Sequence, residues 1–227
     1  MRRYSFIVMI SFFIGAAILI PNLAQAISLT PVTDLSDWNQ YQEKPNNPVS
    51  LTVNDGSVAF VADGTLDYAW GTLVKSYPGS IGVVAKVNVS TASGNCELGI
   101  RKWVGKTDSG NVLSAEIYLV RWSGDYEIDY YLRERDSSGT YRQLAAGSFG
   151  KWDSPAEWSP GEDKYLGLAL VGDEVWFYTP NYGILAKLQI LTPFTPSDDP
   201  IFLVGYAASG ADNHIEGVIK DVSIVFP

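Results

Sequence analysis

The feature that most constrains this chain is a two-residue alternation of side-chain character. It is clearest where Val83, Ala85, Val87 and Val89 alternate with Val84, Lys86, Asn88 and Ser90. It recurs over 214–226, where we expect Ile215, Gly217, Ile219, Asp221, Ser223 and Val225 to share one face. Side chains along a strand point alternately to opposite faces, so the pattern predicts strands with one buried face. Because no long segment shows a helical period, the chain is predicted to be all-β.

Further strand-like runs are separated by turn-forming pairs and triplets such as Asp63-Gly64 and Ser123-Gly124-Asp125. The runs lie at 49–53, 57–62, 96–103, 112–122, 126–135, 141–146, 165–171, 174–179, 184–191 and 201–207. Gly172-Asp173 predicts a tight hairpin, which we expect near the middle of a covered sheet because it is apolar on both faces. Many short strands in one unit predict a sandwich of two antiparallel sheets or a barrel.

The first 26 residues have the pattern of an export signal. Two arginines, Arg2 and Arg3, precede an apolar run from Ile7 to Ile20, and Ala24-Gln25-Ala26 follows as a small-residue cleavage site. The run is too short to span a bilayer as a helix. We therefore predict a signal peptide over 1–26 and a single domain over 27–227. The mature protein is expected to be secreted, extracellular or periplasmic, without a membrane anchor.

The net charge of the mature chain limits the classes of partner that it can bind. The full chain has 16 basic and 25 acidic residues; removal of Arg2 and Arg3 leaves 14 basic residues and a net charge of −11. Such a surface repels nucleic-acid phosphates and anionic lipid head groups, which argues against both as partners. A neutral polymer meets no such barrier. The sequence does not predict an oligomeric state.

Cysteine and histidine counts exclude several kinds of site. Cys96 is the only cysteine, so an intramolecular disulfide and a Cys-based zinc cluster are ruled out, and a buried, inert thiol is expected. His214 is the only histidine, and no nucleophile elbow accompanies it, so a Ser-His-Asp triad and a histidine-based metal site are not expected. We predict no cofactor and no metal ligand. Structural calcium is an alternative, with 197–199 or 210–213 as the loops that could hold it.

The order of these features resembles that of the concanavalin A-like lectin and glucanase superfamily. The resemblance begins with DLSDWNQYQ, strengthens through AKVNVSTASGNCELGIRKW and YYLRERDSSGTYRQLAAGSFGKW, and closes with GYAASGADNHIEGVIKDVSIVFP. It covers nearly the whole mature chain. It implies a jelly roll of two curved sheets, whose last strand pairs back near the N-terminus. In many members of the superfamily a concave sheet face holds a polysaccharide.

Some members are hydrolases with a Glu-x-Asp-x-Glu strand, or one with an extra residue before the last Glu. Here Glu127 and Asp129 match the first two acids, but the third position is Tyr131, or Leu132 if a bulge intervenes. Glu134 is an odd number of residues from Glu127 and is therefore expected on the opposite face of the strand. The strand then lacks the acid that protonates a departing sugar oxygen. We therefore expect no catalytic residue on it, although whether the protein is an enzyme stays open.

Aromatic and charged residues supply the candidate ligand-binding set, because flat rings stack on sugar rings while polar groups bind hydroxyls. The predicted ligand-binding residues are Arg101, Trp103, Glu127, Asp129, Tyr131, Arg133, Trp152 and Trp158. Arg101 and Trp103 share one parity, as do the four residues from Glu127 to Arg133. Trp152 and Trp158 lie in a Pro- and Ser-rich loop, with packing beneath that loop as the alternative. The other strand indoles, Trp38, Trp70 and Trp176, are expected in the core.

Three functions remain. The leading hypothesis is an exported, noncatalytic, lectin-like domain that binds a polysaccharide or oligosaccharide on its concave face. The first alternative is a glycoside hydrolase or lyase of the same fold. The second is a surface or matrix protein that uses the sandwich for protein contacts.

Overall fold

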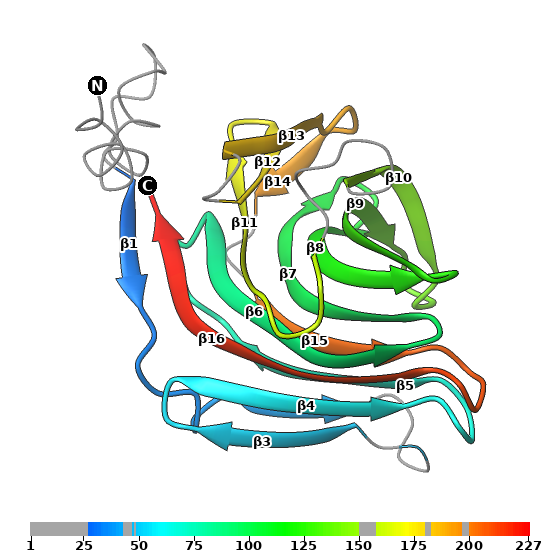
Figure 1. Ribbon diagram of the computed structural model, residues 1–227. Helices are drawn as coiled ribbons and strands as arrows, with labels where there is room; N and C mark the ends of the chain where they lie inside the picture. The colour runs from blue at the N-terminus through cyan, green and yellow to red at the C-terminus, as the bar shows by residue number, and fades with distance from the viewer. Residues whose placement is uncertain (1–26, 43–46, 48, 150–157, 180–182, 197–199) are drawn as a thin grey trace, which may run out of the picture.

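The computed structural model describes residues 27–42, 47, 49–149, 158–179, 183–196 and 200–227, and these residues form strands and turns (Figure 1). The predicted signal peptide over 1–26 lies outside the described residues. Within the described ranges, no helix is long and apolar enough to cross a membrane. The prediction of an all-β chain is confirmed.

Two antiparallel sheets form a sandwich. The first runs in the order β13 (Gly183–Gln189), β12 (Glu174–Thr179), β11 (Asp163–Val171), β6 (Gly82–Ser93), β16 (His214–Phe226), β4 (Ser57–Asp63), β3 (Ser50–Asn54), with β1 (Ser28–Pro31) paired to β16. The second runs β10 (Tyr141–Phe149), β9 (Asp125–Arg135), β8 (Val112–Trp122), β7 (Cys96–Thr107), β15 (Ile201–Ala207), β5 (Ala69–Lys75), β2 (Asn39–Gln42), with β14 (Phe194–Pro196) paired to β7.

The core lies between the two sheets, and the sequence alternation determines which side chains enter it. Val83, Ala85, Val87 and Val89 are all fully buried, as predicted. On β15 of the opposite sheet, a Cβ placed on Gly205 would lie 2.7 Å from the ring of Phe60 on β4. The two sheets therefore approach closely at this point, and a glycine is needed to accommodate the ring.

The last strand, β16, pairs with three strands from earlier in the chain. β16 lies between β6 and β4, and its end pairs with β1, so that Phe226 faces Ser28. This pairing confirms the expected return of the last strand to the N-terminal region.

The predicted alternation of β16 is wrong after Lys220. The register shifts between Lys220 and Ser223, and Asp221 has a positive φ of 50°. This bulge reverses the parity, so Val222 and Ile224 are buried on the side occupied by Ile215 and Ile219 before it.

The Gly172-Asp173 hairpin joins β11 and β12 as predicted, with Gly172 at a positive φ of 64°. Its expected position in the middle of a sheet is wrong. Only β13 separates β12 from the sheet edge, and the outward-facing Trp176 is half-buried beside Lys187.

Cys96 lies at the start of β7 and is fully buried. Burial raises the pKa of its thiol to about 12. The side chain is therefore an inert part of the core, as the sequence predicts.

Neighbouring residues of β4 test the assignment of its two faces. Phe60→Ala should lower the free energy of unfolding by about 3–5 kcal/mol, because it empties a fully buried site between the sheets. Val61→Ala, on the outer face at 38% exposure, should cost about 1 kcal/mol or less. Urea denaturation of both variants measures the difference. Equal losses would contradict this assignment.

Candidate functional site

One face of the second sheet turns away from the core, and we call it the open face. Neighbours in register share a face, so Arg101 on β7, Glu116 on β8 and Tyr131 on β9 form one row across it. The same face also has a small buried cluster of Tyr118, Val120, Phe202 and Val204, against which Trp70, Val74, Trp103 and Tyr131 pack. The open face thus has an apolar cluster of its own.

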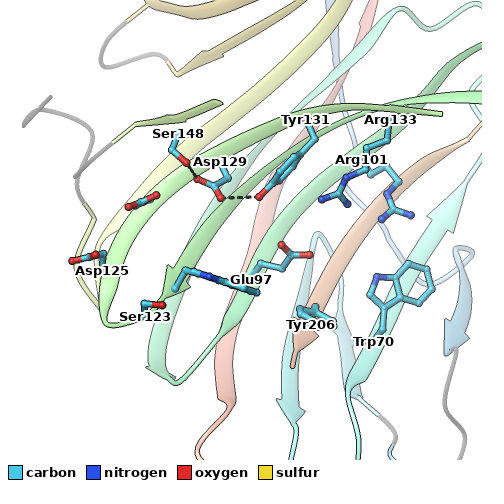
Figure 2. A pocket seen from close by; sticks show the side chains of 12 residues that line it. Trp70, Glu97, Arg101, Ser123, Asp125, Asp129, Tyr131, Arg133, Ser148 and Tyr206 are labelled. Carbon is cyan, nitrogen blue, oxygen red and sulfur yellow. Dashed lines mark hydrogen bonds between the residues drawn. The ribbon is translucent and has the colours of Figure 1, made fainter. Parts of the chain in front are cut away.

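A pocket of about 580 Å³ hollows this face (Figure 2). Five predicted residues line it: Arg101, Glu127, Asp129, Tyr131 and Arg133. Seven more were not predicted to bind a ligand: Trp70, Glu97, Trp122, Ser123, Asp125, Ser148 and Tyr206. The parity shared by Arg101 and Trp103 also includes Glu97, so the sequence did contain a signal for that residue.

The three predicted tryptophans have different outcomes. Trp103 is half-buried on the open face, with its ring 5.5 Å from that of Phe202, and does not line the pocket. Trp152 lies outside the described residues.

The prediction that Trp158 binds a ligand is wrong. It is only 1% exposed, its indole nitrogen donates to the backbone oxygen of Glu127 at 2.9 Å, and its ring meets the edge of Tyr126. This side chain is part of the core cluster between the sheets, so it presents no surface for stacking. Trp70 is the converse case: it was expected in the core, but it is half-buried and lines the pocket.

Glu116 is the centre of the polar part of the open face. Its carboxylate is fully buried and accepts hydrogen bonds from the hydroxyls of Ser114 at 2.9 Å and Tyr118 at 3.0 Å. Arg101 Nε lies 3.1 Å from Oε1, and Arg133 Nη1 lies 2.9 Å from Oε2. A buried charge is tolerated when it is paired and fully hydrogen-bonded, and these contacts provide both.

Asp129 is held by two hydroxyl groups. Tyr131 donates to its Oδ2 at 2.7 Å, and Ser148 on β10 donates to Oδ1. Burial, and then the neighbouring Asp129 carboxylate, raise the pKa of Tyr131, which keeps its proton on the phenol. The third position of the motif thus carries a tyrosine, and Leu132 is buried in the core. Glu134 points away from this face to Asn111 and Arg142.

Glu97 is an acidic residue of the pocket whose pKa is raised. The side chain is half-buried at the pocket wall, and loss of hydration raises the pKa of its carboxyl to about 7. The nearby Arg133 and Arg101 lower this pKa, whereas Glu116 and Asp129 raise it. Glu97 can therefore carry a proton near neutral pH, as a general acid must.

Aromatic rings border the same pocket. Trp122 is 52% exposed at the end of β8, where it faces Asp125 across the turn. Trp70 on β5 and Tyr206 on β15 are paired in register, and Tyr41 meets the edge of Trp70 at 5.8 Å. Exposure of an indole to water at a concave surface is typical of a binding site.

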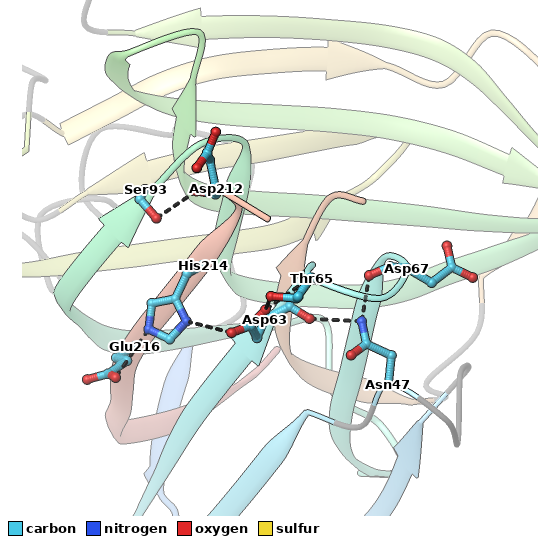
Figure 3. A network of polar contacts seen from close by, with 8 residues as sticks. All are labelled: Asn47, Asp63, Thr65, Asp67, Ser93, Asp212, His214 and Glu216. Atoms are coloured by element: carbon cyan, nitrogen blue, oxygen red, sulfur yellow. Dashed lines mark hydrogen bonds and ion pairs between the residues drawn. The ribbon is translucent and has the colours of Figure 1, made fainter. Parts of the chain in front are cut away.

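His214 belongs to a structural network outside this pocket (Figure 3). Its Nε2 lies 3.1 Å from Oε1 of Glu216, and its Nδ1 lies 3.7 Å from Oδ2 of Asp63. The amide of Asn47 donates to the backbone oxygen of Asp63 at 2.8 Å, which links Asn47 to the end of β4. These contacts match the expected half-exposed strand histidine.

The calcium alternative stays a prediction. Loop 197–199 lies outside the described residues. In the second proposed loop, the Asn213 amide is engaged with the backbone of Ser209 and Asn95. Among the residues that are described, no group of three or more His, Cys, Asp or Glu side chains could hold a metal ion.

Comparison with known proteins bears on the fold. No family model matches this sequence, and no curated protein matches it. Among solved structures, the kappa-carrageenase from Pseudoalteromonas carrageenovora, in complex with an oligotetrasaccharide of kappa-carrageenan, is similar with a TM-score of 0.55 and 10% identity over 92% of this chain and 99% of that chain. The Bacillus licheniformis beta-glucanase gives 0.53 and 11% over 90% and 99%.

A third similar structure is LamA from Z. galactanivorans in complex with laminaritriose and laminaritetraose, with a TM-score of 0.54 and 14% identity over 87% of this chain and 94% of that chain. At such identities the similarity establishes the fold alone. The chain has the concanavalin A-like jelly-roll fold that the sequence predicted.

The raised pKa of Glu97 predicts how stability depends on pH. Between the unfolded value of 4.5 and the folded value of about 7, the folded state binds a proton that the unfolded state has released. Stability due to this group is therefore complete below about pH 4.5 and falls as pH rises to 7. Glu97→Gln should lose less stability than the parent protein between pH 5 and pH 8, as measured by urea midpoints. Equal losses in both proteins would contradict the shift.

Proposed function

We propose that this protein binds a carbohydrate chain in the pocket of the open face. One pocket is lined both by the indoles of Trp70 and Trp122 and by charged and hydroxyl groups from β7, β9 and β10. This combination is the observation that carries the proposal. Indole rings stack on the apolar faces of sugars, while carboxylates and guanidinium groups bind sugar hydroxyls.

The size of the site favours an oligosaccharide over a single sugar. Trp70 lies on β5 and Trp122 on β8, with β15 and β7 between them. Neighbouring strands are about 4.8 Å apart, so the two indoles arise from strands separated by about 14 Å. A ligand that contacts both indoles therefore crosses several strands.

Two comparisons support this proposal. The kappa-carrageenase and LamA structures each contain a bound oligosaccharide, and both share this chain's fold. The predicted signal peptide is consistent with a role outside the cytoplasm, where such polymers are found. We propose accordingly that the mature domain acts after export.

Glycoside hydrolysis is a second candidate, favoured by the protonation of Glu97. Hydrolysis requires an acid that protonates the departing oxygen and a carboxylate that acts as nucleophile or base. Glu97 has a pKa of about 7 and shares the open face with Asp129, whose carboxylate is oriented by Tyr131 and Ser148. In this reading Glu97 is the acid and Asp129 the carboxylate, from two strands instead of one.

Removal of an exposed ring tests carbohydrate binding. A glycan array should first identify a ligand, and Trp122→Ala should then weaken that ligand's binding by about tenfold, because a stacking surface is lost. Isothermal titration calorimetry gives the affinities. Trp176→Ala, on the outer face of the first sheet, is the matched control and should bind normally. Absence of glycan binding, together with self-association, would instead favour a protein-contact role.

Release of reducing ends from a polysaccharide panel tests hydrolysis. If activity is found, Glu97→Gln should reduce it by about 100-fold or more, since the proton donor is lost while binding is kept. Glu127→Gln, on the same face, should retain most of the activity. Full activity in Glu97→Gln would exclude the assigned acid.

A further inference from the structure

The open face contains more positive charge around Glu116 than that carboxylate can neutralise. Arg101 and Arg133 approach it from opposite sides, on β7 and β9, and each contacts a different oxygen. One carboxylate compensates one guanidinium group. The remaining partners, Ser114 and Tyr118, are neutral hydroxyls, so the buried cluster has a net positive charge.

The excess charge is accessible at Arg133. The Arg101 side chain is only 6% exposed and has the rings of Trp70, Tyr141 and Phe202 within 5.5–5.8 Å. The Arg133 side chain is 25% exposed and lies 4.1 Å above the ring of Tyr131. Figure 2 shows both guanidinium groups directed into the pocket, between Tyr131 and Trp70.

The acids that line the pocket do not cancel this charge. Asp125 and Glu127 lie at the start of β9, and Glu127 is six residues from Arg133. A strand rises about 3.4 Å per residue, so these two positions are about 20 Å apart, beyond a Debye length of about 8 Å at physiological ionic strength. Asp129 is four residues, about 14 Å, from Arg133 along the strand, which is also beyond that length. Glu97 is partly protonated at neutral pH, so it offsets only part of the charge.

We propose that the Arg133 end of the pocket is an anion subsite, which binds an acidic group carried by the glycan. The inference rests on the proposed carbohydrate binding and adds a substrate class to it. A guanidinium group presents two parallel N–H donors that match a carboxylate or a sulfate. Among the described residues, Arg133 donates only to Glu116, through one amino group, so its other donors can bind the ligand.

The overall charge of the protein restricts which acidic glycans fit. The mature chain carries a net charge of −11, which opposes the approach of a densely charged polymer. A chain with single acidic groups among neutral sugars meets less repulsion. The preferred ligand is therefore a largely neutral glycan with isolated carboxylate or sulfate groups.

Matched pairs of oligosaccharides test this proposal. One pair is an oligosaccharide with a single glucuronic acid among neutral sugars and its carboxyl-reduced form; the other is a singly sulfated oligosaccharide and its desulfated form. The protein should bind at least one acidic member about tenfold or more tightly than its neutral counterpart. The member that shows the larger ratio distinguishes carboxylate from sulfate.

Arg133→Gln should bring that ratio close to one, because the acidic member loses more affinity than the neutral member. Arg142→Gln removes an equal charge from an exposed arginine outside the pocket and should leave the ratio unchanged. Circular dichroism checks that both variants fold. The comparison within the parent protein does not depend on either variant.

The outcomes separate the two proposals. Equal binding of acidic and neutral members by the parent protein would overturn the anion subsite and leave carbohydrate binding intact. A ratio that persists in folded Arg133→Gln would also overturn it. Failure to bind any of the four probes, or any glycan on an array, would overturn both proposals.

Discussion

The open face depends on one buried carboxylate. Glu116 has no exposed surface, and removal of a carboxylate from water is costly unless nearby groups replace its hydration. Its partners come from three adjacent strands, so β7, β8 and β9 must stay in register for the charge to be compensated. The same contacts orient Arg101 and Arg133 toward the pocket. A binding surface that is fixed before the ligand arrives avoids the entropic cost of ordering it.

The two faces of the second sheet have different environments. Residues of one parity, such as Ile100 and Ile128, enter the core between the sheets, and their neighbours, such as Arg101 and Asp129, enter the pocket. Stability therefore comes mainly from one set of side chains. In the proposed function, the other set binds the ligand: the rings of Trp70 and Trp122 would provide stacking surfaces, and the charged groups of β7 and β9 would provide direction and chemical selectivity.

Local alternation predicts this fold well where one face of a strand is buried and the other is polar. It fails at β5, from Ala69 to Lys75, which is largely buried on both sides and was not predicted. It also fails at Asp221, where a bulge reverses the parity. On the open face, parity correctly groups the four residues of β9. It could not show that Trp158 is buried, because position in a polar segment does not determine whether an indole faces the core or the solvent.

The central claim is that a glycan occupies the pocket of the open face, and indole N–H resonances in an NMR titration test it most directly. The seven tryptophans report from different places in the molecule. On addition of a glycan ligand, the account predicts shifts for Trp70 and Trp122, and none for the buried Trp38 and Trp158 or for Trp176 on the other sheet. A bound glycan that shifts Trp176 and leaves Trp70 and Trp122 unchanged would contradict it.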